Sequence, residues 1–393
     1  MADGKRGVDV IAVTTADWDH PVWTNKQRLA SGLAPRHRVL YVESVGLRTP
    51  SLAYRDWARM ARRLGHAVRG VTQVAPGLWV LSPLLVPRYQ SGTIRSGNGW
   101  ALARQVARAA RALGFERPVL WTFAAIDPRI LVAARASACI LHVVDDLGAV
   151  PGVSPRALET MEVRLLPHVD VVLASSRPLF RRWAGRHPNV RYWPNVAEVE
   201  RFQPVAQGRV APDPLLRHLP RPRACYVGAI DGYKVDLGLL AAAVRQRPDW
   251  HWVMAGPVGL GHPATRRHLP RAPNLHWLGP VPESRVPALL AGCDAALLPH
   301  RTNGYTAASE PIKLREYQAA GLPIVTSLAH WAGEPGVMAA PDATAFARAL
   351  DQARSLHTAG FRLALSEYAG RYSWERRIAE AEVLLDAYSA PRA

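Results

Sequence analysis

Residues 294–327 read DAALLPHRTNGYTAASEPIKLREYQAAGLPIVTS, and this stretch decides the fold class. Its apolar beginning predicts a strand over residues 295–298, and its apolar end predicts a buried strand over residues 323–327. Between them the composition predicts a small, polar loop at residues 299–308, followed by a helix over residues 310–320. A strand, a helix and a second buried strand in this order are typical of a parallel sheet covered by helices.

The predicted helix has boundary signals at both ends. Ser309 suits the N-cap, Pro311 suits the first turn, and Gly321 suits the left-handed position after the last turn. A helix N-terminus that follows a strand and a loop binds anions, because its free N–H groups and its dipole favour phosphate. Lys313 can add a positive charge to a diphosphate, and Glu316 can accept hydrogen bonds from two vicinal ribose hydroxyls. Alternatively, the two residues are an i,i+3 pair on the surface.

The same alternation of apolar runs and helical stretches extends over the whole chain. Strands are predicted in the first half at residues 10–14, 39–43, 119–123, 140–144 and 171–174, and in the second half at 224–228, 252–255, 274–278, 295–298 and 324–327. The proline-rich residues 194–222 separate the two sets and suggest an interdomain linker. We therefore expect an α/β fold of two Rossmann-like, doubly wound domains that face a central cleft, where the carboxyl ends of their strands bind ligands.

Composition and charge narrow the class of protein. The 393 residues are 49% hydrophobic, which fits two domains of roughly 150–200 residues each. The three cysteines are far apart, so neither a disulfide framework nor a zinc site is expected. No signal peptide or membrane span is predicted, because prolines interrupt the long uncharged stretch at residues 70–87. A cytoplasmic protein fits best.

The formal net charge is +18, and part of the excess is clustered. Five arginines lie within Arg55–Arg69, and Arg104, Arg108 and Arg111 line a second helical stretch. Such patches attract anionic partners, including phospholipid headgroups, so the protein could lie against the inner face of a membrane. Alternatively, these arginines lie on helix faces that are exposed to solvent and have no binding role.

The helix and the strand after it match the pattern P-x-K-L-x-E-Y-x-A-x-G-x-P-V-V, and the matching residues are Pro311, Lys313, Leu314, Glu316, Tyr317, Ala319, Gly321, Pro323, Ile324 and Val325. The chain thus resembles GT-B glycosyltransferases, specifically the family-4-like, teichuronic-acid and exopolysaccharide enzymes. The resemblance implies a donor site that includes Pro311 and Leu314, with Glu316 on the ribose and Lys313 on the phosphates. Where many relatives carry the first glutamate of an E-x7-E motif, this chain has Ala308, with Glu310 two residues further on.

Residues 225–240 resemble the strand, loop and helix that open the donor domain of these enzymes. The resemblance implies that Gly228 and Lys234 face the diphosphate, although Ala229 stands where many relatives have arginine. Residues 255–259 and 277–281, including Val281, resemble the loops that pack on the base. The implied domains are an acceptor-binding domain at 1–200, a nucleotide-sugar-binding domain at 201–372, and a C-terminal helix at 373–393 that crosses back to the first domain.

Two features of the first half concern the acceptor. The opening of the chain resembles that of the same branch, and Trp18 and Trp23 either line an acceptor pocket or pack at the domain edge. Residues 141–152, LHVVDDLGAVPG, run from a strand into Asp145 and Asp146. One of these carboxylates can deprotonate the acceptor hydroxyl, which predicts inversion at the anomeric carbon.

Adjacent side chains on an extended segment point to opposite sides, so only one of the two aspartates can face the acceptor. We assign the base to Asp146 first and Asp145 second, and the other aspartate is expected to cap the next segment. His142, within the strand, is expected to be buried and not a ligand.

The predicted partners are a UDP-, dTDP- or GDP-sugar donor and a lipid-linked or small-molecule acceptor. No metal or other cofactor is expected, and no nucleic acid. Two other classes stay open: a nucleotide-sugar epimerase on the same architecture, and a basic nucleic-acid-binding protein, although no recognisable binding module is present.

Overall fold

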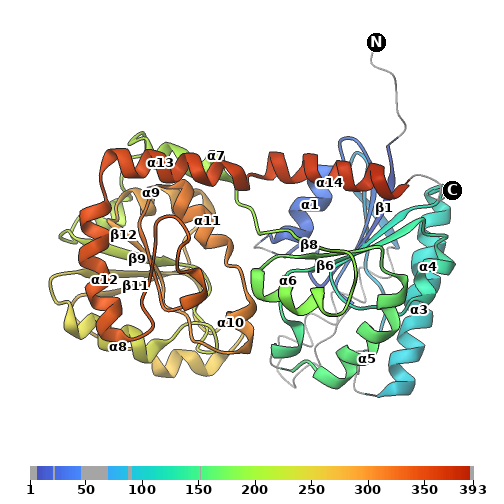
Figure 1. The fold of residues 1–393 in the computed structure, drawn as a ribbon, viewed down its shortest axis with the longest axis horizontal. Helices are drawn as coiled ribbons and strands as arrows, with labels where there is room; N and C mark the ends of the chain where they lie inside the picture. The colour runs from blue at the N-terminus through green and yellow to red at the C-terminus, as the bar shows by residue number, and fades with distance from the viewer. Residues whose placement is uncertain (1–6, 21–22, 46–69, 87–90, 151, 390–393) are drawn as a thin grey trace, which may run out of the picture. The chain divides into compact units, whose positions relative to one another are not determined.

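The structure is a computed structural model that describes residues 7–20, 23–45, 70–86, 91–150 and 152–389. By their internal contacts the residues divide into two compact units. Unit 1 comprises residues 1–194 and 377–393, and unit 2 comprises residues 195–376. Each unit is built around its own sheet (Figure 1).

The sheet of unit 1 has eight strands among the described residues, in the order β3-β4-β2-β1-β5-β6-β7-β8. They are β1 (Asp9–Val13), β2 (Arg38–Val42), β3 (Val71–Ala75), β4 (Leu78–Leu81), β5 (Val119–Thr122), β6 (Ala138–Val143), β7 (Val171–Ala174) and β8 (Val190–Tyr192). All neighbours pair in parallel except β3 and β4, which form an antiparallel hairpin. Strands β1, β5 and β7 are buried along their whole length, as parallel strands covered on both faces are.

Among the described residues, the helices of unit 1 are α1 (Asn25–Leu33), α3 (Gly92–Ala112), α4 (Arg129–Ala133), α5 (Pro155–Leu165), α6 (Arg177–Ala184) and α14 (Trp374–Ser389), the last of which belongs to this unit from Arg377 onward. Helix α14 lies beside α1 (Figure 1). Gly32 makes this approach possible, because a Cβ there would lie 2.4 Å from Ile378 Cδ1. The expected return of the C-terminal helix to the first half of the chain is confirmed.

Unit 2 has a six-stranded sheet, parallel throughout, in the order β11-β10-β9-β12-β13-β14. Its strands are β9 (Arg223–Val227), β10 (His251–Ala255), β11 (Leu275–Gly279), β12 (Ala295–Leu298), β13 (Ile324–Thr326) and β14 (Val337–Ala339). Its helices are α7 (Val199–Ala206), α8 (Leu237–Gln246), α9 (Val286–Ala291), α10 (Gly304–Ala308), α11 (Ile312–Ala319), α12 (Ala343–Leu356) and α13 (Ala359–Ala369).

Each face of the unit 2 sheet has its own apolar core. On β9, Cys225 and Val227 point to the face covered by α7, α9, α11 and α13. Ala224 and Tyr226, which alternate with them, point to the face covered by α8 and α12. This arrangement of α/β layers is the doubly wound one that the sequence predicts.

The ten predicted strands are all confirmed, with ends that shift by no more than two residues. The sequence prediction missed β3, β4, β8 and β14. The predicted linker at residues 194–222 is not an irregular connection, because residues from Asn195 onward belong to unit 2 and include the short 3₁₀ turn Pro214–Leu216 and α7. Val199, Phe202 and Val205 of that helix are buried in the core of unit 2.

Residues 294–327 fold as predicted at the C-terminal end of α11 and differently in the segment before this helix. Gly321 has φ +72°, and the N–H groups of Gly321 and Leu322 bond back to the last turn of α11, so the left-handed termination is confirmed. The predicted loop contains the short helix α10, which Asn303 caps with a hydrogen bond from Thr306 N. Ser309 is not an N-cap; it ends α10, and α11 begins after Pro311.

Candidate functional site

Helix α11 presents two different sides. Leu314 is fully buried in the core of unit 2. Tyr317 is also buried, and its hydroxyl accepts a hydrogen bond of 2.8 Å from the N–H of Val227, which fixes α11 to the end of β9. The side chains of Lys313 and Glu316 are partly accessible and form an ion pair, with 2.6 Å between Nζ and Oε2. The surface pairing that the sequence left open is therefore present, and the pair lies at the start of the helix that Pro311 begins.

The ends of β9, β10 and β11 lie close together through their backbones. Gly228 N donates to Ala255 O, and Gly256 N donates to Gly279 O at 2.7 Å. A Cβ on Gly256, whose φ is +143°, would lie 1.9 Å from Gly228 O. Only glycine allows this approach, which leaves main-chain groups and no bulky side chain at these strand ends. Val281, after β11, packs partly buried against the core instead.

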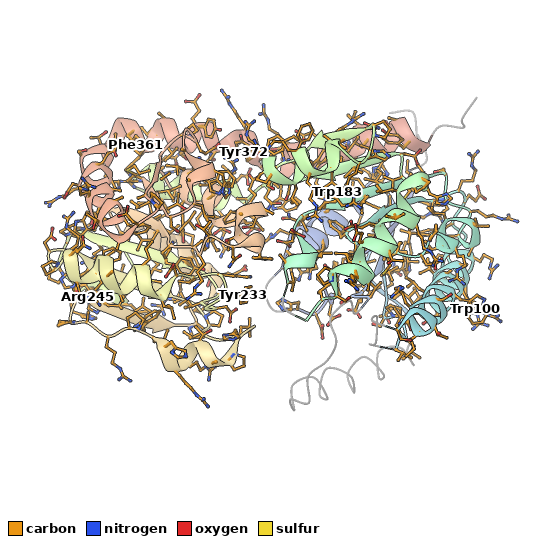
Figure 2. The ribbon with its side chains drawn as sticks, turned by 60° about the horizontal axis from the view of Figure 1, so that its bottom comes forward. Trp100, Trp183, Tyr233, Arg245, Phe361 and Tyr372 are labelled. Carbon is orange, nitrogen blue, oxygen red and sulfur yellow. The ribbon has the colours of Figure 1, made fainter. Side chains whose placement is uncertain are left out.

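Lys234 lies in the loop after β9, between two tyrosines. Its Nζ lies 5.3 Å from the ring centre of Tyr233 and 5.2 Å from that of Tyr305 on α10. Tyr233 is labelled in Figure 2. Arg301 N donates to the Lys234 carbonyl, and Asn303 Nδ2 donates to the Tyr233 carbonyl, both at 2.7 Å. The loops after β9 and β12 thus hold one another, and the cation–π contacts orient the ammonium group.

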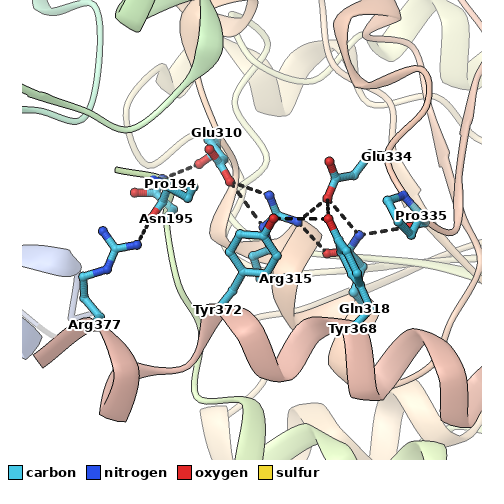
Figure 3. A network of polar contacts seen from close by, with 10 residues as sticks. All are labelled: Pro194, Asn195, Glu310, Arg315, Gln318, Glu334, Pro335, Tyr368, Tyr372 and Arg377. Carbon is cyan, nitrogen blue, oxygen red and sulfur yellow. Dashed lines mark hydrogen bonds and ion pairs between the residues drawn. The ribbon is translucent and has the colours of Figure 1, made fainter. Parts of the chain in front are cut away.

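Arg315, between Lys313 and Glu316 in sequence, is buried with 1% of its surface exposed. Its guanidinium binds the carboxylates of Glu310 and Glu334, and Tyr372 stacks on it at 3.6 Å (Figure 3). Gln318 also contacts the guanidinium. Glu310, the glutamate close to the E-x7-E position, is therefore occupied in holding α11 in place. The sequence prediction missed this network, although a glutamate and an arginine five residues apart beside a helix start were visible.

The two aspartates after β6 have different surroundings. Asp146 caps the short 3₁₀ turn Leu147–Ala149 by accepting from Gly148 N, and it pairs with Arg182 at 2.8 Å. Asp145 has no hydrogen bond or ion pair to any described residue, and its charge acts on Lys26. The capping role expected of one aspartate therefore falls to Asp146.

Lys26, the second residue of α1, is buried, with 8% of its surface exposed. Burial lowers the pKa of its ammonium group, and the charge of Asp145 partly opposes this. Its Nζ lies 5.7 Å from the ring centre of Phe123. His142 is buried nearby, as expected, and burial holds its pKa well below the usual range. The sequence prediction missed Lys26, because its place in an amphipathic helix gives no sign of burial.

A pocket with an empty volume of about 390 Å³ adjoins the two aspartates. Its walls come from the ends of β5 and β6 and from α5 and α6, and they include Ala124, Asp145, Asp146, Leu158, Arg182 and Trp183. The arrangement can hold a small polar group beside an apolar one.

Trp18 and Trp23 lie together after β1, with ring centres 5.0 Å apart. Trp18 also packs edge-on against Tyr41, and its main-chain N–H donates to Glu43 Oε1 at 2.7 Å, while Trp23 is 36% exposed. Trp18 therefore supports the fold of unit 1, and Trp23 offers an exposed aromatic surface.

Within the described part of the chain, no three or more histidine, cysteine or acidic side chains are placed to share a metal ion. No helix in that part is long and apolar enough to cross a membrane. The predicted cluster Arg55–Arg69 lies outside the described residues.

Comparison with known proteins concerns the region that contains α11. The model of the family "Glycosyl transferases group 1" matches residues 221–355, which contain β9 to β14 and all of α11. Residues 221–355 are similar to this family, and we refer to them as the group 1 domain. This group 1 domain includes Gly228, Lys234, Lys313 and Glu316.

Relatives extend the similarity beyond the group 1 domain. TuaH of Bacillus subtilis, named for glycosyl transfer in teichuronic acid biosynthesis, is 30% identical over 177 residues. The match spans 43% of this chain and 43% of TuaH, so it covers less than half of that relative.

Solved structures establish the fold of the whole chain as GT-B. Sucrose-phosphate synthase of Thermosynechococcus elongatus superposes with a TM-score of 0.67 at 16% identity, over 96% of this chain and 98% of that one. HepE of Anabaena, solved with UDP and glucose, superposes with a TM-score of 0.61 at 15% identity, over 94% of this chain and 98% of HepE.

Proposed function

We propose that this protein is a glycosyltransferase that moves a sugar from a nucleoside diphosphate to an acceptor hydroxyl. The observation that carries the proposal is the Lys313–Glu316 pair at the start of α11, inside the group 1 domain. A nucleoside diphosphate gives each member of the pair a partner of its own: the phosphates bind Lys313, and the ribose hydroxyls bind Glu316. UDP is the first donor nucleotide to test, since HepE was solved with it.

Unit 2 supplies the groups that stabilise the leaving diphosphate. Lys234 and Lys313 contribute two positive charges, and the glycines Gly228 and Gly256 keep the strand ends free of bulky side chains, so that a phosphate can approach the main chain closely. Such groups favour the transition state, because negative charge develops on the diphosphate as the bond to the sugar breaks. The proposal uses lysines for this role and requires no metal.

Of the two aspartates, we propose Asp145 as the base and Asp146 as its structural support. Asp146 already has a main-chain donor and Arg182, which hold its charge and its orientation. The Asp145 carboxylate has no such partner, so it can accept the proton of an acceptor hydroxyl. Attack assisted by such a base inverts the anomeric carbon.

The acceptor is proposed to bind unit 1, with the pocket beside Asp145 and the exposed face of Trp23 as candidate contacts. A lipid-linked acceptor would place the protein at the inner face of a membrane. In the described structure, support for this comes from α3, where the exposed Trp100, Arg104, Arg108 and Arg111 follow one another at helical spacing. Figure 2 labels Trp100 on this helix. An aromatic side chain among arginines is typical of a surface that binds anionic lipid headgroups.

The proposal is tested by incubating the protein with UDP-, dTDP- and GDP-sugars and measuring release of the nucleoside diphosphate, with and without candidate acceptors. We expect one nucleotide to support turnover and to raise the melting temperature, since a bound ligand stabilises the folded state. If none of the three nucleoside diphosphates stabilises the protein, the donor assignment is wrong.

A further inference from the structure

His300 lies two residues beyond the end of β12, beside the loop that carries Lys234. An isolated β-bridge joins it to Val235, and its main-chain N–H donates to Leu298 O at 2.9 Å. The side chain is 8% exposed, and its ring nitrogen Nδ1 is buried without a hydrogen-bond partner among the described residues. Buried polar atoms are normally paired, so an unpaired imidazole nitrogen at the end of a strand calls for an explanation.

The groups around this imidazole are basic or aromatic. Lys234 and His330 are the charged groups that act on it, and the ring of Tyr226 meets it edge-on at 6.3 Å. Burial, followed by the charges of Lys234 and His330, lowers the pKa of His300 to about 4. At neutral pH the side chain is therefore uncharged and has one ring nitrogen that can donate and one that can accept.

We propose that His300 contacts the diphosphate of the donor together with Lys234, and that it takes up a proton as the diphosphate binds. This inference rests on the proposed function and adds a residue that the family pattern does not mark. An anion bound at the carboxyl ends of β9 and β12 would explain both the unpaired nitrogen of His300 and the basic groups Lys234 and His330 around it.

The direction of the pH effect follows from linkage. A diphosphate beside His300 opposes the two causes that lower its pKa, because it neutralises Lys234 and favours the charged imidazole. The pKa is then higher in the complex than in the free protein. Diphosphate affinity therefore gains a contribution as the pH falls through the pKa of the complex, and the gain ends near the free value of about 4.

The test is titration calorimetry with UDP, dTDP, GDP and the corresponding nucleosides, between pH 5.5 and pH 8 and in two buffers of different ionisation enthalpy. The wild-type protein is compared with His300→Asn and His300→Gln. The matched control is His276→Asn: His276 is in the same unit, and burial also lowers its pKa, but it stacks on His251 near the amino ends of β10 and β11. Melting curves verify that each variant is folded.

We expect the wild type to take up protons when it binds its preferred nucleoside diphosphate, and not when it binds the corresponding nucleoside. His300→Asn and His300→Gln should lose this uptake and bind the diphosphate roughly tenfold more weakly, with unchanged nucleoside affinity, since a hydrogen bond to a charged group is lost. His276→Asn should behave as the wild type.

Folded His300 variants with wild-type affinity and proton uptake would overturn the inference alone. Failure of the wild type to bind any of the three diphosphates would overturn the donor site and this inference with it.

Discussion

Lys313 and Glu316 are ion-paired across one turn of α11, while Tyr317, the next residue, is hydrogen-bonded to the main chain of β9. The two contacts have different consequences. Tyr317 fixes the position of the helix, so the pair always lies at the same place relative to Gly228. The side chains of the pair are partly accessible, so each of them can give up its contact with the other and bind a ligand instead.

Replacing Glu316 with glutamine should weaken nucleotide binding by about 1–3 kcal/mol, because the ribose hydroxyls lose a charged acceptor. The fold should survive, since the side chain is not part of the core. Calorimetry with the preferred nucleoside diphosphate measures the loss. Glu367→Gln, an exposed change on α13, is the control and should have no effect. A folded Glu316→Gln protein with full affinity would remove Glu316 from the ribose site.

Lys313→Ala and Lys234→Ala should each weaken the binding of a nucleoside diphosphate more than that of the plain nucleoside. The reason is that both ammonium groups are assigned to the phosphates, and a charged contact contributes about 1.5–3 kcal/mol. The comparison of the two ligands by calorimetry is the measurement. Arg245→Ala, an exposed change on α8, controls for net charge. Equal losses for both ligands would exclude a phosphate role.

Asp145→Asn should lower turnover by about two to four orders of magnitude, the range for loss of a general base. Donor affinity should stay unchanged, because the residue belongs to unit 1 and the donor groups to unit 2. Asp146→Asn is the matched variant: it weakens the cap and the Arg182 pair, so it should lower the melting temperature more than the rate. The product's anomeric proton coupling, measured by NMR, tests the mechanism without a variant, and retention would contradict an aspartate base.

Arg315→Ala should destabilise the protein by about 3–5 kcal/mol, because it leaves the buried carboxylate of Glu310 and the half-buried carboxylate of Glu334 without their counter-charge. Arg348→Ala, an exposed change on α12, is the control. Denaturant unfolding measures both.

The same network predicts acid sensitivity. Burial raises the pKa of Glu334, but the charge of Arg315 and the hydrogen bonds around it lower it more, so the net shift is downward. A carboxyl group with a lowered folded pKa contributes stability above its unfolded pKa, and the contribution is lost as pH falls through the folded value. Unfolding of the wild type should therefore become easier below about pH 4.3, and Arg315→Ala should lose much of this dependence.

Vesicles test the surface on α3. The wild type should sediment with anionic vesicles at low salt and be released as salt rises, because screening weakens the attraction. Arg104→Glu combined with Arg108→Glu should reduce binding, whereas the same number of charge reversals at Arg348 and Arg354 on α12 should reduce it less. Absence of wild-type binding at low salt would favour a small, freely diffusing acceptor.

The features that sequence reasoning recovered are those with a local cause. Gly321 ends α11 because a left-handed residue is needed there, and Val171–Ala174 forms a strand because the run is apolar and buried on both faces. The strand β3 was missed because Thr72, Gln73 and Val74 are exposed and show no burial pattern.

The missed features of the candidate site depend on residues that are distant in sequence. Arg315 and Glu334 are nineteen positions apart. Their contact could be predicted only if the exact residue at which α11 begins were known. The surroundings of Asp145 and Asp146 depend on the turn after β6, where Asp146 has φ −77° and ψ 88°. Simple alternation along a strand could not assign these two side chains.

The position of α14 has a consequence for how this protein can change by recombination. All strands of unit 1 precede residue 195, yet Ile378 packs on Gly32, Glu382 pairs with Arg36, and the Tyr388 hydroxyl accepts from Asn189. A gene fragment that ends after residue 194 would encode the sheet without the helix that covers α1. Exchange of either unit between related genes therefore requires two crossovers, near residues 194 and 376, so that the first and last segments are inherited together and residues 195–376 move as one continuous block.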